Sequence, residues 1–313
     1  MFNKSALKFG LLIFFASLLM SACGSQLQEV DNYAGTSIQL IDGLERTISL
    51  EAPAERIVSL APSNTEILFA IGAGNQIVGR DEFSDYPPEA LDLPSIGGSF
   101  GDLNTEAIAA LEPDLILAAE INTADQVKAL EDLGMTVYWL ANPNTLEEMY
   151  DNLRIVAQLT GHGTDAETLI ADLSARVQAV DDALKDLTEL PNVFYEIDGN
   201  DPNAPWTSGA GTFIHLLITR AKGINIGSVL DGEYAQISIE ELIIQNPQII
   251  LLGDTAFGVT PESVTVRAGW ENLLAVQNNQ VFPFDDNLAS RPGPRLVDGL
   301  EAMARLLHPE AFN

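Results

Sequence analysis

This chain of 313 residues has few of the residues on which metal and disulfide chemistry depend. Its only cysteine is Cys23, so no disulfide can form within the chain. Its three histidines, His162, His215 and His308, are far apart in the sequence, and none belongs to a zinc-binding pair such as H-x-x-x-H. We therefore expect no metal site and no resident cofactor.

The motifs of several common enzyme classes are also absent. The sequence contains no G-x-S-x-G hydrolase motif and no G-x-x-x-x-G-K-[ST] phosphate-binding loop. The glycine-rich stretch GAGNQIVG at 72–79 ends a predicted helix instead of leading into one. A phosphate bound there would meet no helix N-terminus, so the stretch does not indicate a dinucleotide site. We expect that the protein is not an enzyme.

Basic residues are scarce, with 15 Lys and Arg against 45 Asp and Glu, which gives a formal net charge of -30. This charge repels the phosphates of nucleic acids and anionic lipid head groups, so we expect no nucleic-acid partner. In so acidic a protein, an arginine that is buried in a cleft is expected to have a specific task.

The long apolar run of the chain, from Phe9 to Met20, follows two lysines near the N-terminus, which is typical of a secretory signal. The run is shorter than the roughly 20 residues that a membrane-spanning helix needs. Small residues before Cys23 and a polar tail after it resemble the lipobox of bacterial lipoproteins. The resemblance implies a signal peptide at 1–22 and an exported protein held by a lipid on Cys23 at the outer face of the cytoplasmic membrane. The alternative is a plain signal peptide with an incidental cysteine.

After a tether at 23–53, which contains a predicted hairpin at 36–50, the chain alternates strands and helices. A strand at 56–62 leads into a helix that we expect to be capped by Ser63 or Asn64 and stopped by Gly72 and Gly74. The segment 103–119 predicts a capped helix, a stop at Pro113 and a buried strand. The segment 124–141 repeats the order of helix, glycine and strand. These elements predict a lobe at 54–162.

The segment 191–313 repeats this pattern. It predicts a strand at 192–198, a helix at 211–223 and two helix-to-strand units, at 237–254 and 268–286. Glu240 precedes Pro247 by seven residues, as Glu106 precedes Pro113. Alternating strands and helices indicate parallel sheets with right-handed crossovers, so we predict two α/β lobes of related design.

The segment between the lobes, predicted as a bridge at 163–190, reads as one long helix. Its apolar residues recur every three or four positions and form one stripe: Leu169, Leu173, Val177, Val180, Leu184 and Leu187. A helix over 166–187 is roughly 33 Å long at about 1.5 Å per residue. We expect it to join the lobes as a strut; the alternative is a helix packed within one lobe.

Ligands of parallel α/β sheets bind beyond the carboxyl ends of the strands, and two lobes would bring two such edges face to face. The loops at these ends carry aromatic and arginine side chains among glycines and prolines. The candidate wall residues of a ligand site are Phe83, Tyr86, Phe100, Trp206, Tyr234, Arg291 and Arg295. Each aromatic taken singly can also be an anchor for its loop.

Several stretches together resemble one protein family. They include RIVSLAPSNTEILFAIGAGNQIVGRDEFSDYPPEA at 56–90, ISIEELIIQNPQIIL at 237–251 and SRPGPRLVDGLEAMARL at 290–306. These resemble the substrate-binding proteins of bacterial ABC importers for vitamin B12, ferric siderophores and haem, from about residue 54 to the end. The resemblance implies the class III periplasmic binding protein fold, in which two parallel-sheet α/β lobes are bridged by one long α-helix.

The resemblance also implies partners. In the family, a glutamate on each lobe pairs with arginines of the membrane permease, and Glu106 and Glu240 match those positions. Both also stand in the first turn of a helix, where an acid favours the positive end of the dipole. Ser238 and Glu241 predict a capping box that leaves Glu240 free of this duty. We expect a monomer that works with a permease and its ATPase.

The closest likeness is to cobalamin binders, in which the loop positions of Phe83, Phe100, Trp206 and Tyr234 carry aromatic contacts and Arg291 matches a cleft arginine. Ala119 and Asn287 stand where cobalamin binders can have tryptophan and aspartate, so Asn287 is a further candidate contact. The predicted ligand is a metal chelate, a corrinoid first. A ferric siderophore bound by Arg291, Arg295 and Arg80, or haem, is the alternative, and an exported enzyme or a sensor lipoprotein are alternatives of other classes.

Overall fold

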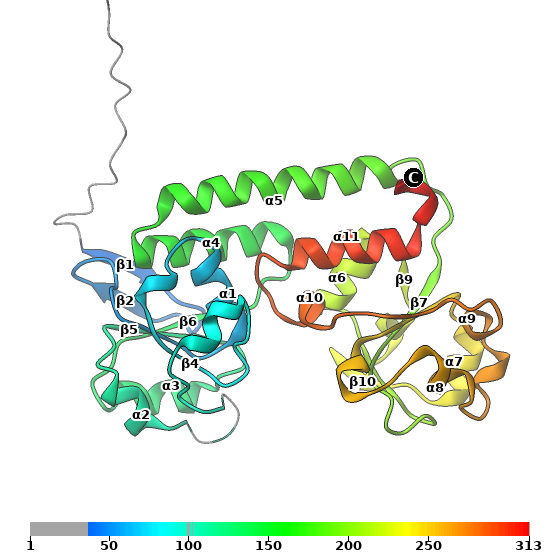
Figure 1. Ribbon diagram of the computed structural model, residues 1–313, viewed down its shortest axis with the longest axis horizontal. Helices are drawn as coiled ribbons and strands as arrows, with labels where there is room; N and C mark the ends of the chain where they lie inside the picture. The colour runs from blue at the N-terminus through cyan, green and yellow to red at the C-terminus, as the bar shows by residue number, and fades with distance from the viewer. Residues whose placement is uncertain (1–36, 99–100, 102, 313) are drawn as a thin grey trace, which may run out of the picture. The chain divides into compact units, whose positions relative to one another are not determined.

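The computed structural model describes residues 37–98, 101 and 103–312 (Figure 1). This part begins with an antiparallel hairpin of β1 (Ile38–Ile41) and β2 (Thr47–Leu50). Its turn is held by the buried carboxylate of Asp42, which accepts hydrogen bonds from the backbone N–H groups of Leu44 and Arg46, both at 3.0 Å. The predicted hairpin is confirmed.

The N-lobe is built on a four-stranded parallel sheet of order β4-β3-β5-β6. Its strands are β3 (Ile57–Ser59), β4 (Ile77–Arg80), β5 (Leu115–Ala119) and β6 (Val137–Leu140). The helices of this lobe are α1 (Pro62–Ala70), α2 (Thr105–Ala110), α3 (Ala124–Glu131) and α4 (Leu146–Thr160), with 3-10 turns η1 (Gly74–Gln76) and η2 (Pro88–Asp92). Strands β3, β5 and β6 are buried throughout because helices cover the sheet.

The C-lobe has a six-stranded sheet of order β10-β8-β7-β11-β12, with β9 beside β7. Its strands are β7 (Asn192–Asp198), β8 (Trp206–Ser208), β9 (Ile224–Asn225), β10 (Tyr234–Gln236), β11 (Ile249–Leu252) and β12 (Val281–Pro283). The edge formed by β8 and β10 is antiparallel, unlike the rest. The short loop at 199–205 between β7 and β8 explains this difference, because a parallel crossover needs a dozen or more residues.

Most helices of the C-lobe are short, and the longest of them lies near the end of the chain. They are α6 (Phe213–Arg220), α7 (Ile239–Gln245), α8 (Pro261–Thr265), α9 (Leu274–Gln277), α10 (Asn287–Ser290) and α11 (Leu296–Leu307). The 3-10 turns are η3 (Ile226–Val229), η4 (Gly253–Phe257), η5 (Trp270–Asn272) and η6 (Pro309–Phe312). Most of these elements agree with the predicted repeat, but α4 and α11 had no sequence-based prediction.

The long helix α5 (Gly163–Leu184) connects the two lobes and packs against α4 of the N-lobe and α11 of the C-lobe (Figure 1). Its buried face contains Leu173, Val177, Val180 and Leu184 as predicted, whereas Leu169 is only partly buried. The architecture of two α/β lobes bridged by one helix is therefore confirmed. The division of the chain into 23–53, 54–162, 163–190 and 191–313 stays a prediction.

The first turn of α1 differs from the sequence-based prediction. Its N-cap is Ala61 and its first residue is Pro62, so Ser63 and Asn64 lie inside the helix. Proline suits the first helical position because its fixed φ matches the helix and its missing N–H is not needed there. The side-chain amide of Asn64 instead donates to the carbonyl of Leu117 at 3.0 Å.

The predicted capping box at α7 is only half formed. The hydroxyl of Ser238 accepts a hydrogen bond from the backbone N–H of Glu241 at 3.2 Å. The carboxylate of Glu241, however, accepts from the side chain of Gln245 at 2.7 Å, one turn farther along the helix.

None of the helices that the structure describes is long and apolar enough to cross a membrane.

Candidate ligand-binding site

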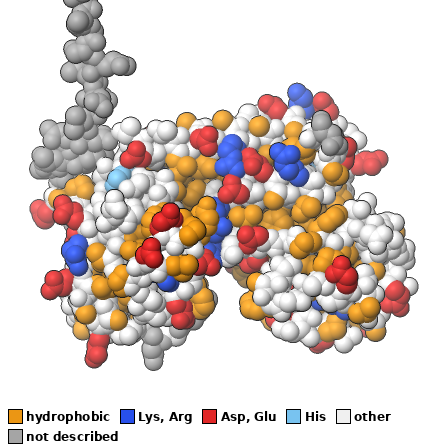
Figure 2. Space-filling model, in the orientation of Figure 1, with side chains coloured by type: hydrophobic (Ala, Val, Ile, Leu, Met, Phe, Trp, Pro, Cys, Tyr) orange, Lys and Arg blue, Asp and Glu red, His pale blue; other side chains and the backbone are white. Residues whose placement is uncertain are grey.

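The surface is hollowed between the two lobes, and basic side chains lie at the inner end of this hollow (Figure 2). On the N-lobe, the loop after β4 contains Phe83 and Tyr86. On the C-lobe, Trp206 begins β8 and Tyr234 begins β10. These four aromatic side chains are 45%, 43%, 42% and 49% exposed, respectively, which is unusual for rings of this size.

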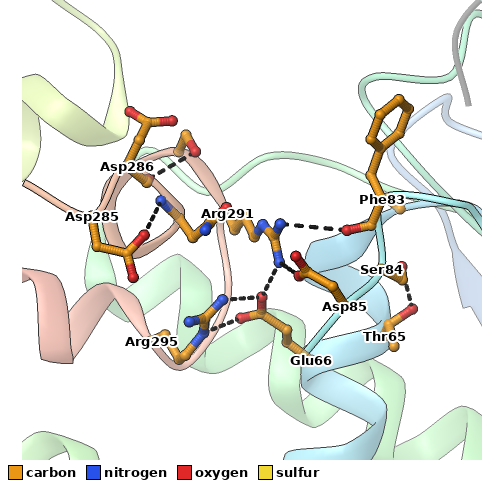
Figure 3. A network of polar contacts seen from close by, with 12 residues as sticks. Thr65, Glu66, Phe83, Ser84, Asp85, Asp285, Asp286, Arg291 and Arg295 are labelled. Atoms are coloured by element: carbon orange, nitrogen blue, oxygen red, sulfur yellow. Dashed lines mark hydrogen bonds and ion pairs between the residues drawn. The ribbon is translucent and has the colours of Figure 1, made fainter. Parts of the chain in front are cut away.

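A buried network fixes the loop that carries Phe83. The carboxylate of Asp81 accepts hydrogen bonds from the backbone N–H of Phe83 at 3.0 Å and from the hydroxyl of Ser84. The Ser84 hydroxyl lies 2.8 Å from that of Thr65 on α1 (Figure 3). Asp81, Ser84 and Thr65 are all buried, so the interior of the lobe fixes the loop while Phe83 itself remains exposed.

Trp206 and Tyr234 lie on one face of the antiparallel β8–β10 pair. Trp206 is paired with Gln236, and Tyr234 is two residues before Gln236, so the two rings are diagonal neighbours. Surrounding protein atoms raise the pKa of Tyr234, and the carboxylates of Glu233, Asp286 and Glu120 add to this shift. Glu120 follows β5 of the N-lobe, so Tyr234 lies within electrostatic reach of the opposite lobe.

The two predicted ligand-binding arginines are engaged with carboxylates of the N-lobe (Figure 3). Arg295 binds Glu66 through Nε at 2.8 Å and Nη2 at 2.5 Å. Arg291 Nη1 lies 3.1 Å from Glu66 and 2.7 Å from Asp85. We call these four residues the interlobe ion cluster. The guanidinium of Arg295 also stacks on the Tyr86 ring, with Cζ 3.9 Å from the centroid.

Glu66 is the member of this cluster that the sequence analysis did not identify. It lies in α1 at the point where the polar residues of the helix give way to apolar ones, and its side chain is 1% exposed. A carboxylate that is buried to this degree needs a partner, because desolvation of an unpaired charge is costly. The available signal was the single acid in TEILFA at 65–70. That signal does not say which arginine is the partner.

Other predicted site residues have different surroundings. Arg80 is buried and donates to the carbonyl oxygens of Ala90 and Asp81, both at 2.8 Å, so its guanidinium is engaged by the protein itself and its contact with an anionic ligand stays a prediction. Asn287 is the half-buried first residue of α10. Phe100 and Cys23 lie outside the described residues.

The two predicted docking acids are both exposed. Glu106 is in the first turn of α2 and Glu240 is in the first turn of α7. These helices lie on the side of their lobes that faces away from α5 (Figure 1). The arrangement places one acid on each lobe.

A second buried charge cluster in the C-lobe was also missed. Glu196 on β7 is fully buried and forms a bidentate ion pair with Arg267, at 2.5 and 2.9 Å. Asp254, which follows β11, accepts a hydrogen bond from the backbone N–H of Gly199 at 2.9 Å. Burial raises the pKa of Glu196 to about 7 although Arg267 opposes the shift, and nearby Asp254 adds to it. The cluster supports the loop that leads to Trp206.

Among the residues that the structure describes, no group of three or more His, Cys, Asp and Glu side chains is arranged to hold a metal ion.

Comparisons with known proteins agree with this arrangement. The family described as periplasmic binding protein matches residues 57–288. YvrC of Bacillus subtilis, an uncharacterized ABC transporter substrate-binding lipoprotein, is 28% identical over 310 residues, which is 96% of each chain. The vitamin B12-binding protein of Vibrio cholerae is 31% identical over 256 residues, which cover 82% of this chain and 90% of that one. The apo structure of the periplasmic heme-binding protein RhuT of Roseiflexus has a TM-score of 0.74 at 28% identity, with 82% and 99% coverage.

Proposed function

Since this chain belongs to the periplasmic binding protein family, we propose that it is the substrate-binding component of an ABC importer and that it captures a corrinoid between its two lobes. The observation that carries the proposal is the set of four exposed aromatic side chains, two from each lobe, together with the hollow that the surface shows between the lobes (Figure 2). Large exposed rings indicate a binding surface, and their faces supply affinity when a bulky ligand covers them.

The choice of a corrinoid rests on two supports. A metal-bearing macrocycle is broad enough to contact aromatic side chains from both walls, and the Vibrio cholerae relative is named for vitamin B12. The second candidate is haem, which is also a flat macrocycle, because the Roseiflexus relative is named for heme. A ferric siderophore is the third. The family is one of binding proteins, and we propose no enzymatic step.

Delivery of the ligand requires a membrane partner. Glu106 and Glu240, exposed on separate lobes, are the proposed contacts with basic residues of the permease, whose ATPase drives import. Because one chain carries both acids, a monomer is sufficient for both contacts. The proposed lipid on Cys23 keeps the protein at the outer face of the cytoplasmic membrane, close to the permease. The Bacillus subtilis relative, which is named a lipoprotein and matches 96% of this chain, supports this anchor.

Calorimetric titration of the purified full-length protein tests the ligand. The titrants are cyanocobalamin, dicyanocobinamide, haem and a ferric siderophore, and we expect a corrinoid to bind most tightly. Replacing Trp206 or Tyr234 by alanine is expected to weaken corrinoid binding at least about tenfold, since a stacked ring is lost. Leu133→Ala is the control. Leu133 is also exposed, but it precedes the amino end of β6, whereas the proposed site lies beyond the carboxyl ends of the strands.

Tryptophan fluorescence gives an independent measurement. Of the three tryptophans, Trp139 and Trp270 are buried and Trp206 is exposed, so the response to ligand is expected to become smaller in Trp206→Phe. Tighter binding of haem or a siderophore than of any corrinoid would show that the proposed ligand is wrong. Unchanged corrinoid affinity in Trp206→Ala and Tyr234→Ala would show that the site is elsewhere.

A further inference from the structure

We propose that Glu66 is a specificity-determining residue of the ligand site. By binding Arg291 and Arg295, it withholds both guanidinium groups from the ligand. The site then favours macrocycles with amides at their edges over macrocycles with carboxylates there. This inference rests on the proposed function and names the charge class of its ligand.

The geometry of the interlobe ion cluster is the first support. Glu66 Oε1 is shared between Arg291 at 3.1 Å and Arg295 at 2.5 Å, while Oε2 binds Arg295 Nε at 2.8 Å. Figure 3 shows the Glu66 carboxylate between the two guanidinium groups. Arg291 also contacts Asp85 at 2.7 Å and donates to the carbonyl of Phe83 at 3.4 Å. A ligand carboxylate that approached Arg291 would therefore have to displace a protein carboxylate.

The charges around the cluster are the second support. Within it, the two arginines are balanced by Glu66 and Asp85, so the four side chains have no net charge. Outside it, further acids adjoin the same region. The negative charge of Asp285 raises the pKa of Arg295. The carboxylates that raise the pKa of Tyr234 are Glu233, Asp286 and Glu120. An anionic ligand would meet an acidic wall, whereas a neutral one would not be repelled.

The contact between Arg295 and Tyr86 gives this arginine another task. Its guanidinium lies over the Tyr86 ring with Cζ 3.9 Å from the centroid, and the ring remains 43% exposed. The pairing with Glu66 holds the guanidinium in this place. Arg295 therefore supports an aromatic wall residue from behind, and it is a positioning residue in place of the predicted ligand contact.

The test compares two corrinoids with the same ring. Dicyanocobinamide has amides at its edge, and dicyanocobyrinic acid has carboxylates there. Affinities are measured by calorimetry on the full-length protein in detergent. We expect the wild-type protein to bind the amide form at least about tenfold more tightly. Glu66→Gln keeps the shape of the side chain but removes the charge that Arg291 and Arg295 share, so that only Asp85 still pairs with Arg291. It is expected to raise the affinity for the acid form about tenfold and to change that for the amide form by less than about twofold.

Glu233→Gln is the matched control, because it removes an acid near Tyr234 for which the structure shows no arginine partner among the described residues. It is expected to raise the affinity for the acid form by no more than about twofold, the effect of one screened charge. The gain of Glu66→Gln is expected to disappear in the triple variant Glu66→Gln/Arg291→Gln/Arg295→Gln, because the gain depends on the released guanidinium groups of both arginines. An equal gain in Glu233→Gln, or a gain that persists in the triple variant, would overturn the inference.

Two further outcomes separate this inference from the proposed function. If the wild-type protein binds neither corrinoid, the proposed function fails. If it binds the acid form as tightly as the amide form, or if Glu66→Gln weakens acid binding, the specificity role fails while a corrinoid function stands. Should Glu66→Gln not fold, Asp85→Asn decides, since Asp85 is an exposed partner of Arg291. A gain for the acid form larger than that of Glu233→Gln supports the inference, and no gain overturns it.

Discussion

At the scale of single residues, three arginines of this acidic chain lie beside two of its buried carboxylates. Glu66 is bound by Arg291 and Arg295, and Glu196 is bound by Arg267. A buried carboxylate left without a partner would cost several kcal/mol, so each of these arginines is needed where it lies. The expectation that a buried arginine has a specific task holds, although the task is to pair with the protein itself.

Glu196 leads to a prediction about pH. Burial raises its pKa from 4.5 to about 7 in the folded protein. Between these values the folded state binds more protons than the unfolded state, so this group makes the free energy of unfolding fall as the pH rises from about 5 to 8. Glu196→Gln has no proton to lose there. We expect its unfolding free energy to fall less steeply with pH than that of the wild type, by at most about 1.4 kcal/mol per pH unit.

The measurement is urea unfolding of both proteins at several pH values in this range. Glu196→Gln also changes the contacts with Arg267 and therefore the absolute stability, so only the slopes are compared. Parallel curves would show that Glu196 is already ionised at pH 5 in the folded state.

At the scale of elements, the placement of the site depends on how short helices begin and pack. Arg291 follows α10 and Arg295 directly precedes α11, so these two helices set the position of both guanidinium groups. The contact between α10 and α11 is close because Gly299 has no side chain. A Cβ atom there would lie 2.2 Å from the carbonyl oxygen of Leu288.

Gly299→Ala is therefore expected to destabilise the protein. By helix propensity alone, this substitution inside α11 would add about 1 kcal/mol of stability. The new methyl group would instead collide with the backbone of α10 and separate the two helices, and overpacking of this kind costs roughly 1–3 kcal/mol. Urea unfolding gives the sign of the change. An increase in stability would mean that α10 can move away at little cost.

At the scale of the whole described chain, one continuous core joins the lobes. The largest buried apolar cluster includes Ile67 of the N-lobe, Val177 of α5 and Met303 of the C-lobe. Arg176 of α5 adds ion pairs with Asp298 at 2.5 Å and Glu301 at 2.9 Å, both on α11. Together with the interlobe ion cluster, these contacts connect the two lobes in more than one place.

This bracing predicts that ligand binding causes little closure. Spin labels at Leu133→Cys in the N-lobe and Ile244→Cys in the C-lobe occupy exposed positions. Pulsed electron double resonance with and without cyanocobalamin measures the distance between them. We expect a shift below about 1 Å, as in pre-organised complexes. A shift of several ångströms would show that α5 and the ion cluster act as a hinge.

The two exposed docking acids lead to a separate prediction. The double variant Glu106→Lys/Glu240→Lys is expected to bind a corrinoid within about twofold of the wild type but to lose more than about tenfold of its uptake by cells, since like charges would oppose the permease. The matched control is Asp125→Lys/Glu262→Lys. These exposed acids also stand in first helical turns, one in α3 and one in α8. Unaffected uptake in Glu106→Lys/Glu240→Lys would favour a sensor over a transport component.

The sequence was sufficient wherever structure depends on neighbours along the chain. The alternation of apolar strands with helices predicted the two lobes, and the stripe that contains Leu173 and Val177 predicted the bridging helix. It also predicted four aromatic residues that prove to be exposed, Phe83, Tyr86, Trp206 and Tyr234, and their contact with a ligand stays a prediction. It failed at α1, where Pro62 starts the helix ahead of the expected caps, and it missed α4 and α11.

By itself, then, the sequence determined the order and type of most elements and the side chains available at the edges of the sheets. Only the tertiary structure decided which charges meet. Glu66 and Arg291 are 225 positions apart, and no local pattern links them. Their pairing results from the burial of α1 and the packing of α10 on α11, because a desolvated carboxylate is stable only when the fold supplies its counter-charge.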